Sequence, residues 1–199
     1  MLRSIRPAIV MIVTLTLITG LAYPLATTGL ARLLFPDQAA GSLVMRKGGV
    51  IGSALIGQAF ISERYFHTRP SATVEPDPAD PSKTVSVPDD ASSSGGSNLA
   101  PTAKALTERV AGDVAGLRAE NPGTLIPADL VTTSASGLDP DISPAAAAFQ
   151  VARVARARGL APARVQALVE AHTQGRLFGL IGEPRVNVLA LNLALDGLK

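Results

Sequence analysis

Polar residues at the end of a Pro- and Ser-rich stretch form the first pattern that could contact a ligand. They are Ser94, Gly95, Gly96, Ser97 and Asn98. A helix is expected to open at Pro101, and the start of a helix carries partial positive charge. Glycines also let successive backbone N–H groups converge, so a phosphate could bind there. A flexible Gly/Ser linker is the alternative interpretation of the same residues.

A second polar pair lies on a helix that Ser143 and Pro144 are expected to start. Gln150 and Arg153 are three residues apart, which makes them neighbours on a helix surface. An amide beside a guanidinium suits a phosphate or the carboxylate of a partner. A solvated helix face is the alternative.

Apart from these two segments, the sequence shows no pattern of residues typical of catalysis or metal binding. The chain has no cysteine, which excludes a thiol nucleophile, a disulfide framework and a zinc ribbon. His67 and His172 are interpreted as a surface and a structural histidine, and neither a nucleophile elbow nor a phosphate-binding loop motif occurs. The candidate acids Glu63, Asp129 and Asp139 have no evident partner in the sequence. We therefore expect neither a catalytic site of its own nor a metal site, and a soluble enzyme is a remote alternative.

Charge and composition argue against nucleic acid as a partner. Aromatic residues make up only 4%, too few for a base-stacking platform. The net charge is +2, but Arg3, Arg6 and Arg32 flank one apolar run. Without these three, 15 basic residues face 16 acidic ones, so the rest of the chain is close to neutral.

The apolar run predicts a membrane anchor. Residues 7–31 contain no charge, and a helix of that length exceeds the hydrocarbon core of about 30 Å. We expect a cytoplasmic segment at 1–6 and a transmembrane helix at 7–35, kinked at Pro24. A cleaved signal peptide is the alternative, although Tyr23 and Pro24 stand where its small-residue cleavage site would be. The arginines before the span favour an amino terminus in the cytoplasm and a carboxyl-terminal domain outside it.

Residues 36–199 are expected to form a soluble, helix-rich α+β domain. Apolar runs at 42–46 and 50–56 around Gly48 and Gly49 predict a hairpin. The Pro/Asp/Ser-rich stretch at about 73–97 predicts a mobile loop. Residues 126–131 are interpreted as an extended piece. Helices are predicted to start at Pro101, Pro144 and Pro162 and after Asn187, with inward faces that include Leu106, Val110, Val114, Leu117, Val151, Val154, Val165 and Val169.

The order of motifs along the chain resembles that of the KdpC family, the single-span subunits of the bacterial high-affinity potassium pump. The resemblance covers nearly the whole chain, and Ala100 and Asp141 depart from the residues usual in the family. The matching segments are 52–58 (GSALIGQ), 65–72 (YFHTRPSA), 94–99 (SGGSNL), 126–132 (IPADLVT), 134–144 (SASGLDPDISP), 150–154 (QVARV) and 182–189 (GEPRVNVL).

The resemblance implies a non-catalytic accessory subunit of an ATP-driven potassium import pump in the cell (inner) membrane. Its partners would be a channel-like potassium-binding subunit, a P-type ATPase subunit, a small stabilising subunit and the lipid bilayer. Its implied role is assembly and stability, together with that of a catalytic chaperone that raises the affinity of the ATPase subunit for ATP. The implied nucleotide-contact candidates are Ser94, Gly95, Gly96, Ser97, Asn98, Gln150 and Arg153.

Membrane topology conflicts with direct ATP contact. ATP lies in the cytoplasm, whereas the arginine distribution places the domain outside it. On that reading the matched loops cap the channel-like subunit, and any effect on ATP affinity passes through the assembly. The alternative function is a membrane-anchored envelope protein with a peptide- or glycan-binding domain.

Overall fold

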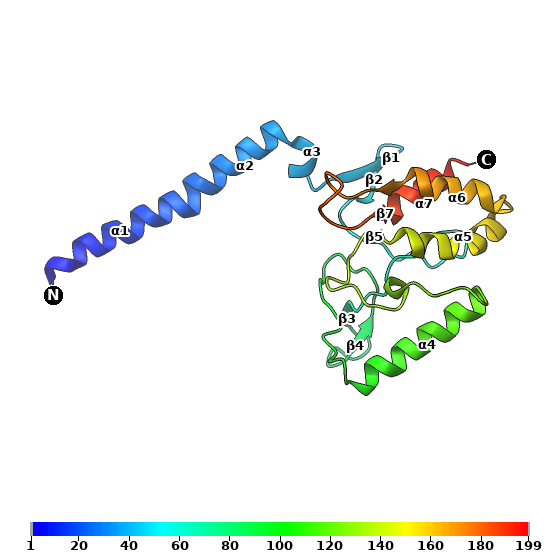
Figure 1. Cartoon of the computed structure of the whole chain (residues 1–199). Coiled ribbons are helices and arrows are strands. Elements are labelled where there is room, and N and C mark those ends of the chain that lie inside the picture. The colour runs from blue at the N-terminus through cyan, green and yellow to red at the C-terminus, as the bar shows by residue number, and fades with distance from the viewer. Residues whose placement is uncertain (1, 199) are drawn as a thin grey trace. The chain divides into compact units, whose positions relative to one another are not determined.

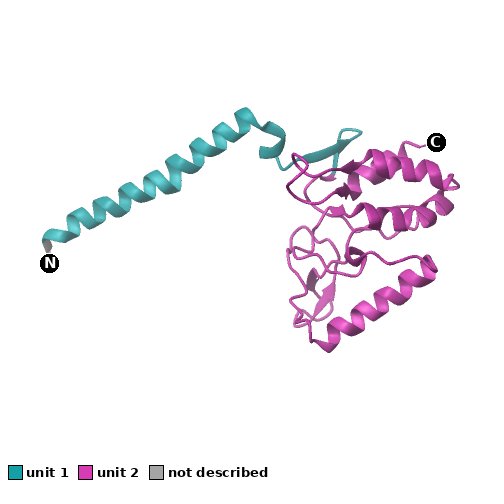
Figure 2. Cartoon of the chain, in the orientation of Figure 1, with its two compact units in different colours: residues 1–51 teal, residues 52–199 magenta. Residues whose placement is uncertain are grey.

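The computed structural model describes residues 2–198 and divides the chain into two compact units. They are Met1–Ile51 and Gly52–Lys199, drawn in teal and magenta in Figure 2. The end of the anchor that the sequence predicts, at residue 35, lies within the first unit.

The first unit is dominated by one long apolar helix. It runs for 30 residues, Ile5–Leu34, and contains an 18-residue window with a mean hydropathy of 2.1, none of which is buried by protein. Side chains such as Ile12, Leu25 and Leu33 stay more than 60% exposed, and that is the surface a lipid environment would cover. A short 3-10 turn precedes the run, and one further helical turn follows it. The elements are Leu2–Ser4, α1 (Ile5–Leu17), η2 (Ile18–Ala22), α2 (Tyr23–Leu34) and α3 (Pro36–Ala39) (Figure 1).

Pro24 is accommodated by a wider turn within a continuous helical run. The residues just before it, η2 (Ile18–Ala22), form a π-helical turn. Proline lacks an N–H and its ring crowds the carbonyl four residues earlier, which a π turn relieves. The Thr27 hydroxyl donates to the carbonyl oxygens of Tyr23 (2.9 Å) and Pro24 (3.1 Å), so this polar side chain is satisfied within its own helix.

The predicted hairpin is present, with a different turn. Strands β1 (Leu43–Arg46) and β2 (Gly49–Ser53) pair, and β2 stops short of the expected end at residue 56. The left-handed positions are Lys47 (φ 51°) and Gly48 (φ 81°), and Gly49 belongs to the strand. Positive φ at both central positions is the pattern of a type I′ turn, and here Lys47 and Gly48 occupy them, so the turn is shifted by one residue from the prediction.

The second unit is built on a small antiparallel sheet. Its strand order is β5–β7–β6, with bounds β5 (Asp141–Ile142), β7 (Arg185–Asn187) and β6 (Thr173–Gln174). Two helices, α5 (Pro144–Arg158) and α7 (Val188–Asp196), pack against β7, and α6 (Pro162–Ala171) packs against both of these helices (Figure 1). The helix-rich α+β prediction is confirmed.

Local signals in the sequence placed these helices correctly. The Ser143 hydroxyl accepts from the Ala146 N–H at 3.0 Å, and Asn187 caps α7 in the same way. Gly159 ends α5 at φ 67°, the left-handed conformation typical of a helix end. Four residues of the predicted apolar faces, Val151, Val154, Val165 and Val169, lie in the core. The core also includes Phe66, Ile142, Val186, Leu191 and Leu195.

Residues 69–131 differ most from the prediction. The stretch expected to be a mobile loop contains the hairpin β3 (Val74–Pro76) and β4 (Thr84–Ser86), and Thr73 beside it is 2% exposed. Helix α4 (Lys104–Glu120) has the predicted apolar face, half-buried against the domain. The piece at 126–131, expected to be extended, instead holds the 3-10 turn η3 (Ala128–Leu130), which packs Leu130 into the core.

Candidate functional site

The two Gly/Ser segments that attracted attention in the sequence pack against each other. The Gly95 N–H donates to the Ser136 carbonyl oxygen at 2.8 Å, and the Ser94 hydroxyl donates to the same oxygen at 3.0 Å. A Cβ added at Gly96 would lie 2.8 Å from the Ala135 oxygen, and one at Gly137 would lie 2.6 Å from the Gly95 oxygen. The glycines are therefore explained by close backbone approach.

Two features of this geometry bear on the predicted phosphate contact. The Gly95 N–H is occupied by the protein's own carbonyl. Helix α4 begins at Lys104, several residues beyond Asn98, so its N–H groups do not start in this segment. Asn98 is exposed at φ 49°, and Ser97 lines a hollow of about 320 Å³ together with Leu106 and Arg109.

Gln150 acts as a buried clamp on the backbone of His67. Its Oε1 accepts from the His67 N–H at 2.8 Å, and its Nε2 donates to the His67 carbonyl at 3.2 Å and to that of Ala146 at 3.3 Å. The residue is 2% exposed. The solvated-face interpretation is wrong for this position, because the side chain points into the domain.

Asn192 on α7 clamps the preceding residue in the same way. Its Oδ1 accepts from the Phe66 N–H at 2.9 Å, and its Nδ2 donates to the Phe66 carbonyl at 3.0 Å. Two amides from two helices thus satisfy both backbone groups of consecutive residues, as a neighbouring strand would. The Phe66 side chain, 0% exposed, is thereby held in the core.

Arg153 completes the clamp and has little left to offer a ligand. Its Nε donates to Glu120 at 2.9 Å, its Nη1 to the carbonyls of Glu63 (2.8 Å) and Tyr65 (2.9 Å), and its Nη2 to Gln150 Oε1 at 2.7 Å. The side chain is 5% exposed. A fixed, planar guanidinium with all three nitrogens engaged is a structural anchor for the 63–67 segment.

A third contact holds this segment, and it was missed in the sequence. Arg158 Nη2 pairs with Asp196 at 2.9 Å, the Tyr65 hydroxyl donates to Asp196 at 3.1 Å, and the guanidinium lies 4.8 Å from the centre of the Tyr65 ring. Arg158 and Asp196 sit near the ends of different helices, so only packing brings them together. A charged residue at the end of each helix was the signal available in the sequence, but it does not indicate which residue the charge pairs with.

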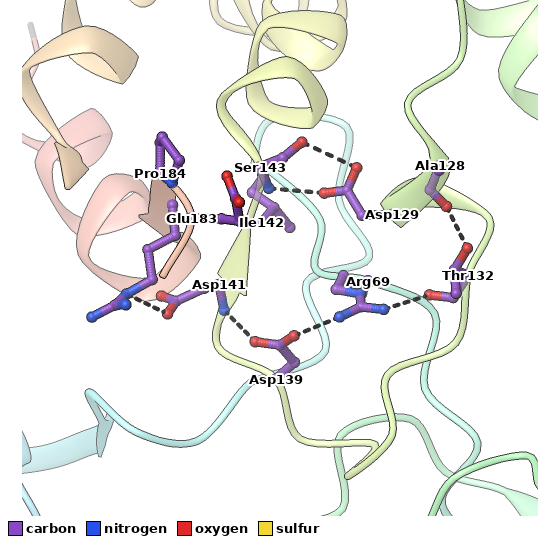
Figure 3. Close-up of a pocket in the computed structure, with 11 residues that line it drawn as sticks. Arg69, Ala128, Asp129, Thr132, Asp139, Asp141, Ile142, Ser143, Glu183 and Pro184 are labelled. Carbon is purple, nitrogen blue, oxygen red and sulfur yellow. Dashed lines mark hydrogen bonds and ion pairs between the residues drawn. The ribbon is translucent and has the colours of Figure 1, made fainter. Parts of the chain in front are cut away.

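An open hollow of about 570 Å³ lies between the loops and the sheet (Figure 3). Asp139 pairs with Arg69 Nη1 at 2.9 Å and accepts from the Asp141 N–H at 3.1 Å. Asp129 accepts from the Ser143 N–H at 2.8 Å and from its hydroxyl at 3.1 Å. The candidate acids Asp129 and Asp139 therefore brace the start of α5 and the loop before it.

Burial shifts the pKa of three groups around these loops. Loss of solvent raises the pKa of the Asp141 carboxyl, although Asn187 and Arg185 act in the opposite direction. Loss of solvent likewise raises the pKa of Asp89, against the Thr68 hydroxyl that donates to it. Burial, reinforced by Arg153, lowers the pKa of His67.

The described residues 2–198 contain no group of three or more His, Asp or Glu side chains arranged to hold a metal ion. Glu63, the remaining candidate acid, contributes its backbone carbonyl to Arg153. Among the candidate residues, the structure thus brings together Gln150 and Arg153, which hold residues 63–67 of the same chain.

Comparison with known proteins agrees with the motif order. The family described as the c chain of the K+-transporting ATPase, KdpC, matches residues 5–197. The chain belongs to the KdpC family. This KdpC-family chain is 66% identical over 196 residues to the potassium-transporting ATPase KdpC subunits of Rhodopseudomonas palustris and Bradyrhizobium diazoefficiens, with 98% of each chain covered. It is also 66% identical over 198 residues to the subunit of Methylobacterium nodulans, covering 100% of this chain and 98% of the relative.

The match includes both the apolar helix and the clamp. A KdpC-family chain with one apolar amino-terminal helix fits a single-pass membrane subunit of a potassium-transporting P-type ATPase. The envelope-protein alternative has no comparable support, because the family match runs through the anchor and the domain together.

Proposed function

We propose that this chain is a non-catalytic accessory subunit that assembles and stabilises an ATP-driven potassium import pump. Its partners are the channel-like potassium-binding subunit, the P-type ATPase subunit and the small stabilising subunit. The anchor holds the chain in the inner membrane with the amino terminus in the cytoplasm and the folded domain outside.

The carrying observation is the clamp. Gln150, the amide candidate for ligand contact, and Arg153, the charged candidate, use their hydrogen-bonding groups to hold residues 63–67 of the same chain. Polar groups this buried and this well satisfied fix a shape. A rigid domain on a membrane tether is suited to hold larger subunits in place.

The catalytic-chaperone role then operates through the assembly. ATP is the substrate of the ATPase subunit, and this subunit raises ATP affinity by favouring a conformation of its partner. Coupling of this kind needs only that the subunit bind one conformation more tightly than another. The Ser94–Asn98 loop takes part by keeping its shape against residues 135–137, and potassium passes through the partner subunits.

Cysteine labelling tests the membrane topology on which this function depends. The chain has no native cysteine, so Ser92→Cys in the exposed loop and Ser4→Cys before the span give two clean reporters. In intact cells carrying the whole complex, a membrane-impermeant maleimide should label Cys at 92 and spare Cys at 4. The reverse pattern would place the domain in the cytoplasm and contradict the proposal.

Photolabelling separates indirect from direct action on ATP. With the purified complex and an azido-ATP probe, adducts are expected on the ATPase subunit. An ATP-competed adduct on residues 94–98 or 150–153 of this chain would refute action through the assembly alone.

A further inference from the structure

The hairpin that follows the anchor leaves one apolar face exposed. A two-residue turn separates strands β1 and β2, so Met45 stands opposite Val50. Leu43 shares their face, because side chains two residues apart on a strand point to the same side. Leu43 is 49% exposed, Met45 58% and Val50 57%, whereas Val44 on the other face is half-buried. These three residues, gathered in one place, form a contact surface that we call the hairpin face.

The hairpin face lies close to the membrane surface, because it belongs to the same unit as the anchor. Both fall within Met1–Ile51, drawn in teal in Figure 2. The helical run Ile5–Leu34 is about 45 Å long, about 15 Å more than the hydrocarbon core, so its end reaches the lipid headgroups. Eight residues separate Leu34 from Leu43, and they span at most about 30 Å even when extended. Chain length alone therefore keeps the hairpin near the bilayer.

The end of the anchor continues the same kind of surface toward the hairpin. Leu33, Leu34 and Phe35 are 78, 57 and 58% exposed. Arg32 is exposed as well and lines an open hollow of about 320 Å³ with Pro36 and two alanines. Apolar side chains beside a basic one are typical of a segment at the boundary between acyl chains and headgroups.

The charges near the hairpin face favour lipid headgroups as its occupant. Arg46 ends β1, and the exposed Lys47 occupies the turn. Between Asp37 and Glu63 the sequence contains no acidic residue. Anionic headgroups attract basic side chains close to a span, and no carboxylate within this stretch opposes that attraction. Headgroups border the end of the anchor wherever protein does not, so the hairpin reaches them without a further partner.

We propose that the hairpin face rests on the bilayer, with Leu43, Met45 and Val50 against the acyl chains and Lys47 on anionic headgroups. The hairpin is then a second membrane contact beside the anchor. An isolated two-stranded hairpin is only marginally stable in water, and a bilayer that covers its apolar face stabilises it. The proposal needs the anchor to span the membrane and does not depend on the proposed role in the pump.

Depth-dependent fluorescence quenching tests the hairpin face. The chain has no cysteine, so Leu43→Cys, Val44→Cys and Met45→Cys can each carry one NBD probe. The full-length chain is placed in vesicles of phosphatidylethanolamine and phosphatidylglycerol that contain a lipid spin-labelled near its headgroup. Probes at 43 and 45 should be quenched about threefold more strongly than the probe at 44, because one face of the strand meets the lipid. Equal quenching at all three positions, or none at 43 and 45, overturns the proposal.

A probe within the span separates failure of the anchor from failure of the hairpin face. Leu25→Cys should be quenched by a lipid spin-labelled deep in its acyl chains. If it is not, the anchor does not span the bilayer, and the proposal falls with it. Quenching at 25 without the alternation at 43–45 would refute the hairpin contact alone.

The assembled complex distinguishes the bilayer from a protein as the occupant. The same alternation of quenching at 43, 44 and 45 is expected when the partner subunits are present. Loss of quenching on assembly would assign the hairpin face to a partner subunit and overturn the proposal.

Reversal of one charge tests the headgroup contact. With the probe at 45, Lys47→Glu should lower the equilibrium constant for contact with phosphatidylglycerol vesicles at least about fivefold. Lys104→Glu makes the same charge change on α4, where the side chain is 88% exposed, and should leave the contact unchanged. Equal quenching in the two variants would refute the contact between Lys47 and anionic headgroups.

Discussion

Truncation of Gln150 tests whether this side chain holds the protein's own backbone or is free for a ligand. Gln150→Ala removes the acceptor of the His67 N–H and of Arg153 Nη2, and the donor to the His67 carbonyl. A buried group left without its partner costs about 1–3 kcal/mol, and a charged one costs more. With two donors left unsatisfied, we expect a loss of about 3–5 kcal/mol in the free energy of unfolding.

The loss is large against the total stability of a domain, about 5–15 kcal/mol. Urea unfolding of the full-length chain in detergent, followed by circular dichroism, should show the midpoint falling by about 2 M. Asn192→Ala removes the matching clamp on Phe66 and should cost a similar amount. Gln166→Ala serves as the control, because that amide donates an exposed hydrogen bond to the surface acid Glu170 and its loss should change stability by less than about 0.5 kcal/mol.

A Gln150→Ala chain as stable as the Gln166→Ala control would refute this reasoning. The amide would then contribute nothing to the fold, and a ligand-contacting role would regain its standing. A loss confined to the ATP dependence of the assembled pump, with unchanged unfolding, would point in the same direction.

Three other predictions concern single sites, each read out by urea unfolding. Burial lowers the pKa of His67, so the unfolded chain binds a proton near pH 6.5 that the folded chain does not bind. The free energy of unfolding should therefore fall as pH drops below about 6.5. His67→Gln should reduce this dependence of stability on pH. An unchanged slope would assign it to other groups. Gly137→Ala should cost more than about 2 kcal/mol, because its Cβ would meet the Gly95 oxygen at 2.6 Å at a φ of 71°, whereas Gly112→Ala on the open face of α4 should gain up to about 1 kcal/mol. Equal effects at the two glycines would contradict the close packing. Ser143→Ala removes the cap of α5 and one partner of Asp129, and should cost about 1 kcal/mol, whereas no loss would mean that the cap is dispensable.

The sequence predicted correctly the elements that depend on residues close together in the chain. The anchor follows from uninterrupted apolar composition, and the caps at Ser143 and Asn187 follow from side chains that reach a backbone N–H three residues away. The turn between β1 and β2 was displaced by one residue, because the sequence names a glycine pair but not which residues take positive φ. The short hairpin β3–β4 was not predicted, because a contact between residues far apart in the sequence holds it: the Thr73 hydroxyl accepts from the Asp90 N–H.

The sequence by itself determined that this chain is a tethered, helix-rich α+β domain of the KdpC family. Only the tertiary structure decided what the candidate residues do. Gln150 meets a backbone 83 residues away and Asn192 one 126 residues away, and no spacing in the sequence encodes such pairings. A polar side chain on a helix looks the same whether it faces solvent, a ligand or a distant loop. The choice is made by packing, because burial imposes a cost on every polar group that finds no partner.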